Sequence, residues 1–102
     1  MRHIEYKKPR IGLYSMGLKA YWSQFPGLRE RLAEYGEFIA KRLETCGAQV
    51  FNYGLVDCEQ AGSTAGDYFS KADVDLIFSH SATYCTSASI LPVHQICPAP
   101  VV

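Results

Sequence analysis

The sequence has no excess of charge of either sign and no long apolar run. Ten Lys and Arg residues balance ten Asp and Glu residues, so the chain offers no electrostatic footprint for a nucleic acid or an anionic membrane surface. No stretch approaches the roughly 20 apolar residues of a membrane span. The N-terminal segment MRHIEYKKPR also lacks the apolar region of a secretory signal. We therefore expect a cytoplasmic protein with no nucleic-acid or membrane partner.

Paired cysteines are absent as well. No Cys-x-x-Cys pair occurs among the four cysteines, which are Cys46, Cys58, Cys85 and Cys97. Scattered cysteines of a cytosolic α/β domain are usually small buried hydrophobic residues, so we expect buried thiols, with neither disulfides nor a zinc site. What the chain does have is 48% hydrophobic and 20% charged residues over 102 positions. This composition is typical of one soluble globular domain.

Short apolar runs alternate with longer amphipathic segments along the chain. We predict strands at Arg10–Ser15, Gln49–Tyr53 and Val74–Phe78. A long helix is predicted at Gln24–Gly47, with Pro26 in its first turn. This helix is the clearest element, because its apolar residues recur at spacings of three and four and so share one stripe. The stripe consists of Leu28, Leu32, Tyr35, Ile39, Leu43 and Cys46.

A second helix is expected after the second strand. Asp57 and Gln60 resemble a capping box at its start, and the helix ends near Lys71. Glycine weakens a helix intrinsically, yet Gly62 and Gly66 both fall inside this one. They leave one face without side chains, and we expect that face to lie close to the sheet.

The remaining segments indicate the architecture. Ser87–Ile96 is predicted to be a helix with Pro92 in its first turn or at a kink, and Val101–Val102 the start of a fourth strand. Strands that alternate with helices indicate a parallel sheet with right-handed connections. We therefore predict an α/β domain with a flavodoxin-like (Rossmann-like) three-layer αβα fold and strand order 2-1-3-4. Because domains rarely end inside a strand, residues 1–102 are expected to be one N-terminal domain of a longer multidomain chain, incomplete at its C-terminus.

The segment Val74–Ser89, VDLIFSHSATYCTSAS, joins an apolar strand to a patch of polar side chains. In open α/β sheets, ligands bind just beyond the carboxyl ends of such strands. The loops Ser15–Gln24 and Ser79–Ser87 are therefore expected to face each other across one crevice. His80 directly follows the strand, and it suits a ligand contact as well as it suits a locally satisfied loop histidine.

The loop after the first strand contains neither a dinucleotide-binding Gly-x-Gly-x-x-Gly nor a P-loop. It is aromatic instead, with Tyr21 and Trp22, and Phe25 follows. These rings could stack on the apolar face of a sugar or could seal the top of the core, and both interpretations stay open. His94 falls on an apolar helix and is expected to be structural. The chain shows no cluster of carboxylates and histidines suited to Mg²⁺ or Mn²⁺.

Two segments resemble a known family. Ile11–Leu28, IGLYSMGLKAYWSQFPGL, and Val74–Pro100, VDLIFSHSATYCTSASILPVHQICPAP, are similar to the N-terminal domain of the L-arabinose isomerase and L-fucose isomerase superfamily. The resemblance is closest to the L-arabinose isomerase-like branch and covers nearly the whole chain from Pro9 onward. It implies a flavodoxin-like domain of a metal-dependent aldose–ketose isomerase, which is an intramolecular oxidoreductase.

The resemblance also implies cofactor and partners. In that family Mn²⁺ or a similar divalent ion acts as the Lewis acid, and its ligands lie in later domains, so this chain alone is expected to be catalytically inert. The N-terminal domain packs in homotrimers or homohexamers and acts as a substrate lid for a neighbouring subunit. The residues that the resemblance places near the sugar are Met16, Gly17, Leu18, Tyr21, Trp22, His80, Thr83 and Tyr84.

One departure from the family bears on the substrate. The Gln-His-Leu-Tyr-Gly-like run of well-known arabinose isomerases is replaced here by Met16-Gly17-Leu18-Lys19-Ala20. A polar contact is thereby lost, so the resemblance leaves the identity of the sugar open. Two alternatives remain beside the isomerase lid. One is a flavodoxin-like module that binds a nucleotide, a flavin or a sugar in the same crevice, and the other is a purely assembling domain.

Overall fold

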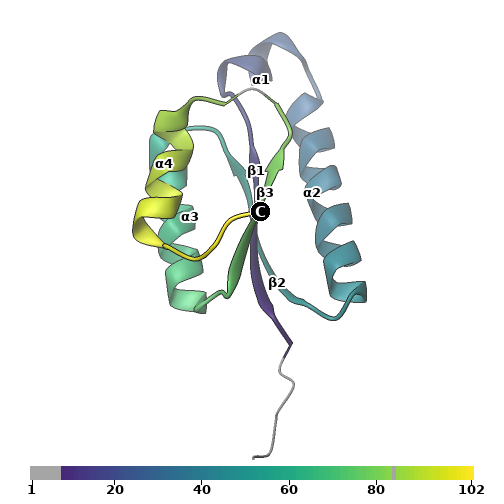
Figure 1. Cartoon of the computed structure of the whole chain (residues 1–102). Helices are drawn as coiled ribbons and strands as arrows, with labels where there is room; N and C mark the ends of the chain where they lie inside the picture. The colour runs from purple at the N-terminus through teal and green to yellow at the C-terminus, as the bar shows by residue number, and fades with distance from the viewer. Residues whose placement is uncertain (1–7, 84) are drawn as a thin grey trace, which may run out of the picture.

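The sheet is built from parallel strands. The computed structural model describes residues 8–83 and 85–102, and within them the three paired strands are β1 (Arg10–Met16), β2 (Gln49–Val56) and β3 (Leu76–Ser81). Their order is β2-β1-β3, so β1 is central and the carboxyl ends of all three strands lie at one edge (Figure 1). The predicted α/β class and parallel sheet are confirmed.

The predicted fourth strand is represented by one parallel bridge, between Ile77 and Val101. The Ile77 amide donates to the Pro100 carbonyl at 2.8 Å, and the Val102 amide donates to the Ile77 carbonyl at 2.9 Å. The end of the described chain therefore lies along the outer edge of β3, on the side where a fourth strand was expected. The described residues contain no fourth strand beyond this bridge.

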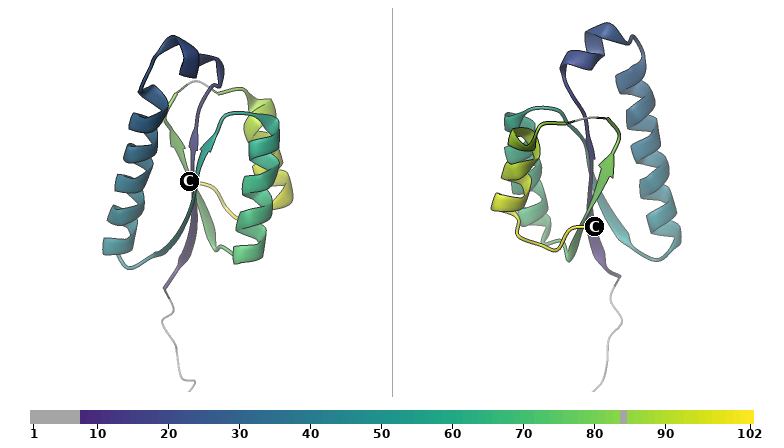
Figure 2. Two further views of the ribbon diagram at one scale, coloured as in Figure 1. Left: turned by 180° about the vertical axis from the view of Figure 1, so that it is seen from behind. Right: turned by 45° about the horizontal axis from the view of Figure 1, so that its top comes forward.

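Helices cover the two faces of the sheet unequally. In the described part of the chain they are α1 (Ala20–Gln24), α2 (Leu28–Thr45), α3 (Glu59–Ala72) and α4 (Ser87–Ile96), and Pro92 lies inside α4 beyond its first turn. One face is covered by α2, and the other by α3 and α4 side by side (Figure 2). No helix within residues 8–83 and 85–102 has the length and apolar content required to cross a bilayer.

The connection between β1 and β2 contains two helices where the sequence predicts one. Pro26 was expected in the first turn of a helix from Gln24 onward, but it lies in the link between α1 and α2. Gly27 follows with φ of 83°, a left-handed conformation that glycine adopts without a steric penalty. The predicted helix Gln24–Gly47 is confirmed over Leu28–Thr45, but its predicted start is wrong because Gly27 turns the chain before α2 begins. The short helix α1 falls in the predicted loop Ser15–Gln24.

The buried face of α2 is narrower than its apolar stripe. Leu32, Gly36 and Ala40 are its buried residues, whereas Tyr35, predicted to belong to the stripe, is 53% exposed. A Cβ atom at Gly36 would lie 3.3 Å from Ser15 Oγ. Small residues therefore set the distance between α2 and the sheet, and the large side chains of the stripe lie at its margin.

The main core lies between the sheet and the α3–α4 pair. Phe69, Tyr14, Ile77 and Val93 are fully buried there, and the ring centroids of Tyr14 and Phe69 are 6.3 Å apart. Burial of a large apolar side chain contributes about 1.5–3 kcal/mol. Gly12 on β1 leaves the space for one of these rings, since a Cβ atom there would lie 2.7 Å from Phe69 Cδ1.

The face of α3 that lacks side chains meets α4. A Cβ atom on Gly62 would collide with the Ser89 carbonyl oxygen, and one on Gly66 would lie 2.9 Å from Ile96 Cβ. The prediction that this face lies against the sheet is therefore wrong. Phe69 occupies the sheet-facing side of α3, so the glycines fall on the side of the neighbouring helix.

The cysteines differ from the prediction of buried thiols. Cys97 is buried, but Cys46 is exposed and Cys58 and Cys85 are half-buried, and all four are free thiols. Cys46 ends α2, and Cys58 directly precedes α3. Helix ends and connecting loops run over the protein surface, so thiols at such positions remain accessible.

Candidate functional site

Two loops meet at the carboxyl edge of the sheet. The Thr83 amide donates to the Met16 carbonyl at 3.1 Å, which joins the loop after β3 to the end of β1. The Gly17 amide donates to the Val56 carbonyl at 3.0 Å, which joins the loop after β1 to β2. Backbone hydrogen bonds thus fix both loops at the edge where open α/β sheets bind ligands.

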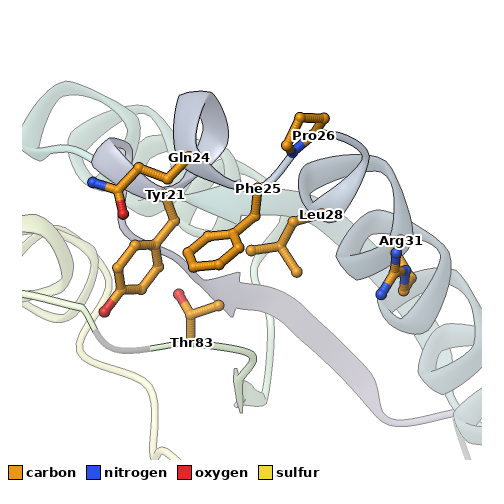
Figure 3. Close-up of a pocket in the computed structure, with 7 residues that line it drawn as sticks. All are labelled: Tyr21, Gln24, Phe25, Pro26, Leu28, Arg31 and Thr83. Carbon is orange, nitrogen blue, oxygen red and sulfur yellow. The ribbon is translucent and has the colours of Figure 1, made fainter.

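A groove of about 640 Å³ opens beside these loops, along the link between α1 and α2 (Figure 3). The rings of Tyr21 and Phe25 lie edge to face, with centroids 5.9 Å apart. In Figure 3 Thr83 lies across the groove from the two rings. The lining residues are Tyr21, Gln24, Phe25, Pro26, Leu28, Arg31 and Thr83.

The lining combines apolar surface with a few polar groups. Phe25 is 52% exposed, which is a large exposed area for an aromatic side chain. Polar groups of Tyr21, Gln24 and Thr83 also face this space (Figure 3). Small-molecule sites are concave and mostly apolar, with a small number of polar groups that orient the ligand. The groove has this character.

Trp22 and Tyr21 are adjacent in the chain but have different surroundings. Trp22 Nε1 donates to Asp57 Oδ2 at 2.7 Å, which ties α1 to the end of β2. The Trp22 ring also packs over Gly17, where a Cβ atom would lie 2.9 Å from Cζ2. Trp22 therefore closes the top of the fold, which is one of the two roles left open for the aromatic residues, whereas Tyr21 lines the groove.

The contact with Trp22 also corrects the predicted cap of α3. Asp57 was expected to pair with Gln60 in a capping box, but Cys58 occupies the N-cap position and no side chain caps the helix. The Asp57 carboxylate instead accepts the indole N–H. A hydrogen bond to an ionised carboxylate is stronger than one between neutral groups, so this tertiary contact replaces the local one.

His80 lies at the end of β3 but does not line the groove. Its Nδ1 is 3.1 Å from Ser15 Oγ, and Ser15 is only 2% exposed. The imidazole therefore has a local partner on the neighbouring strand. This contact fits the interpretation of a locally satisfied histidine that packs on the strand ends.

A second polar pair lies in the core, away from the groove. Tyr14 Oη and His94 Nε2 are 2.9 Å apart. Burial raises the pKa of Tyr14 to about 12, and burial lowers the pKa of His94. The contacts of His94 are thus internal to the fold, as predicted.

The groove brings together only part of the predicted site. Tyr21 and Thr83 line it, and Met16 and Gly17 hold its loops through backbone hydrogen bonds. Leu18, Trp22 and His80 do not line it, and Tyr84 lies outside the described residues. Sequence reasoning named Phe25 among the aromatic residues but assigned no site role to Gln24, Pro26, Leu28 and Arg31. The available signal was the spacing from Tyr21, which is three to Gln24, four to Phe25 and seven to Leu28.

Residues 8–83 and 85–102 hold no group of three or more His, Cys, Asp or Glu side chains arranged for a metal ion. The isomerase resemblance expects the ligands of its Mn²⁺ ion in later domains, outside these residues. The fold and the groove define a parallel α/β domain with a concave surface at the carboxyl edge of its sheet. No protein-family model, no curated protein and no solved structure matches the chain significantly.

Proposed function

We propose that this chain binds a sugar in the groove between the α1–α2 link and Thr83, as the N-terminal lid of an aldose–ketose isomerase. The observation that carries the proposal is that an exposed ring, that of Phe25, and a half-buried ring, that of Tyr21, line one groove together with polar residues at the carboxyl edge of the sheet. Tyr21 and Phe25 supply the rings, and Gln24 and Thr83 supply an amide and a hydroxyl. Aromatic rings pack on the apolar face of a sugar ring, while amides and hydroxyls bond its hydroxyl groups.

The lid role is supported by the openness of the groove. Its walls come from the α1–α2 link, the start of α2 and the β3 loop (Figure 3), so a ligand seated there keeps one side uncovered. A second surface would then enclose the ligand and exclude water. We propose that this surface belongs to a neighbouring subunit of a homotrimer or homohexamer. The metal and the groups that perform the isomerisation would also lie outside this chain, which alone is inert.

The test is a calorimetric titration of the chain with a panel of neutral pentoses and hexoses, and with flavin mononucleotide as comparator. We expect saturable binding of at least one sugar. Phe25→Ala should weaken that binding about tenfold, because base- or ring-stacking surfaces contribute on the order of 1–3 kcal/mol. The matched control is Phe38→Ala, which removes an aromatic ring of similar exposure on α2 outside the groove.

Two results would contradict the proposal. One is the absence of saturable binding for every sugar tested. The other is equal weakening of binding by the Phe25 and Phe38 variants, since this would show that the groove is not the site. Tighter binding of the flavin, lost in the Phe25 variant, would support the nucleotide- or flavin-binding module instead.

A further inference from the structure

The residues that line the groove carry a positive charge and no negative charge. Arg31 is the only ionisable group among the lining residues apart from the Tyr21 phenol, and the lining contains no carboxylate. The described residues form one ion pair, between Lys71 and Asp67, so Arg31 is not neutralised by a described carboxylate. An apolar groove with one unneutralised guanidinium is complementary to a ligand that carries a negative charge.

The position of Arg31 in α2 points to the same conclusion. It lies in the first turn, together with Arg29, where the helix dipole already concentrates positive charge and cations are unfavourable for the helix. No side chain caps this end, because the N-cap residue is Gly27. Glu30, the acidic residue of this first turn, lines a separate hollow together with Arg29 and does not line the groove.

Within the groove, the charged side chain and the polar side chains lie at opposite ends, with apolar side chains between them. In Figure 3 Arg31 lies at one end of the groove and Tyr21 and Gln24 at the other, with Phe25 and Leu28 between them. A sugar ring over the central apolar pair would direct one end to the guanidinium and the opposite hydroxyl groups to the amide and phenol. The planar guanidinium matches the geometry of a carboxylate or a phosphate, which it can bind with two hydrogen bonds.

From this juxtaposition we infer that the groove selects an anionic sugar, one that carries a carboxylate or a phosphate, with Arg31 as the residue that contacts the anionic group. The inference rests on the proposed sugar-binding function and names its substrate class. It differs from L-arabinose and L-fucose, the neutral sugars after which the resembled family is named. Tyr21, Gln24 and Thr83 then hold the sugar hydroxyls, and Phe25 holds the ring.

The experiment compares four probes by calorimetry on the same chain: a neutral hexose, the corresponding uronic acid, the corresponding hexose phosphate, and inorganic phosphate. We expect one of the two anionic sugars to bind about tenfold or more tightly than the neutral hexose, since a hydrogen bond to a charged group is worth more than a neutral one. The preference for uronic acid or phosphate identifies which anion the site accepts. The advantage of the anionic sugar over the neutral hexose should decrease with rising salt, because exposed charges are screened.

Two arginine variants test whether Arg31 is responsible for the preference for the anionic sugar. Arg31→Gln should reduce the ratio of the anionic-sugar affinity to the neutral-hexose affinity from about tenfold to about one. Arg42→Gln is the matched control, because Arg42 is an exposed arginine in the last turn of the same helix and does not line the groove. Both variants change exposed side chains, and equal melting temperatures would show that folding is intact.

The outcomes distinguish this inference from the proposed function. Equal affinity for neutral and anionic sugars overturns the inference and leaves sugar binding in place. An anionic preference that survives in Arg31→Gln also overturns it, as does binding of inorganic phosphate as tight as that of the hexose phosphate, which would indicate a simple anion site. If neither neutral nor anionic sugars bind, the proposed function itself fails.

Discussion

The two faces of the sheet are packed in different ways. On one face α3 and α4 enclose Tyr14 and Phe69, which are fully buried, and Gly62 lets the two helices touch. On the other face α2 lies alone (Figure 1), and Tyr35 and Phe38 are 53% and 63% exposed. The closed α3–α4 face therefore supplies most of the stability, and the open α2 face leaves aromatic side chains free for contacts with other molecules.

The groove follows from this asymmetry. It lies at the N-terminal end of α2, on the open side, and its aromatic residues come from the short helix α1 and the link after it. Segments with few buried apolar contacts are those that proteins use for binding. On the α3–α4 side a smaller pocket, of about 280 Å³, lies between the end of α3 and the segment that follows α4.

The largest effect on stability is expected when an aromatic ring is removed from the core between the sheet and the α3–α4 pair. Phe69→Ala should lower the free energy of unfolding by about 3–5 kcal/mol, because it removes a fully buried side chain and leaves a cavity. Phe38→Ala, on the open face, should change it by less than about 0.5 kcal/mol. Urea unfolding followed by circular dichroism measures both. Similar losses in the two variants would mean that the faces contribute equally.

A second pair of variants compares glycines on the two faces. Gly62→Ala should lower the free energy of unfolding by about 2–3 kcal/mol, since the new methyl group would collide with the Ser89 carbonyl and drive two helices apart. At Gly36 the nearest atom is the Ser15 hydroxyl at 3.3 Å, and alanine improves helix propensity by about 1 kcal/mol. Because that hydroxyl must move by only a few tenths of an ångström, Gly36→Ala should cost less than Gly62→Ala in the same assay. The reverse order of stabilities would refute the close α3–α4 contact.

The presence and type of most elements were predicted well from the sequence. The helix predicted at Ser87–Ile96 is observed with those bounds, and the strand predicted at Arg10–Ser15 extends one residue further, to Met16. A short apolar run such as β1, which is buried on both sides, can be recognised without knowledge of its partners. The break at Gly27 was missed because the apolar spacing continues across it, although the backbone there is left-handed.

The partner that each side chain meets could not be predicted. A helix face without side chains, as at Gly62, suits a sheet or another helix equally well. Asp57 was predicted to cap α3 but precedes its N-cap residue, Cys58, and its carboxylate accepts a hydrogen bond from the indole of Trp22, which is distant in sequence. Such choices depend on the tertiary arrangement, which local patterns do not contain.

Only some residues of the candidate site were predicted from the sequence. The rule that ligands bind beyond strand ends located Tyr21 and Thr83, which line the groove. Arg31 was missed because an exposed arginine on an amphipathic helix is ordinary, and only the turn at Gly27 brings that side chain to the strand ends. His80 was chosen for its position directly after the predicted strand, but it belongs to β3 and contacts Ser15.

A smaller effect separates Trp22 from its neighbour Tyr21. Trp22→Phe should lower the free energy of unfolding by about 1–2 kcal/mol, because the Asp57 carboxylate loses its donor, and it should leave sugar affinity unchanged. Tyr21→Phe should do the opposite, with nearly unchanged stability and weaker binding. Urea unfolding and calorimetry on both variants measure the two quantities. Loss of binding in Trp22→Phe at unchanged stability would assign Trp22 to the site.

The smallest expected effect is a pH dependence that comes from the closed face. Burial lowers the pKa of His94 below its ordinary value of 6.5, and within the described residues its buried Nδ1 has no hydrogen-bond partner. The unfolded chain therefore takes up a proton near pH 6.5 that the folded chain does not, so the free energy of unfolding should fall as the pH drops below 6.5. The loss should level off below the folded-state pKa.

Urea unfolding between pH 7.5 and pH 5 measures this dependence, and His94→Gln serves as its control, because glutamine keeps a hydrogen-bonding side chain near Tyr14 but does not titrate. The variant should be less stable at neutral pH and should lose the part of the slope that begins near pH 6.5. Carboxylates titrate at lower pH in both proteins, so the difference between the two curves isolates the histidine. Parallel curves would mean that His94 is as accessible to protons in the folded chain as in the unfolded one, and that the α3–α4 face is not closed around it.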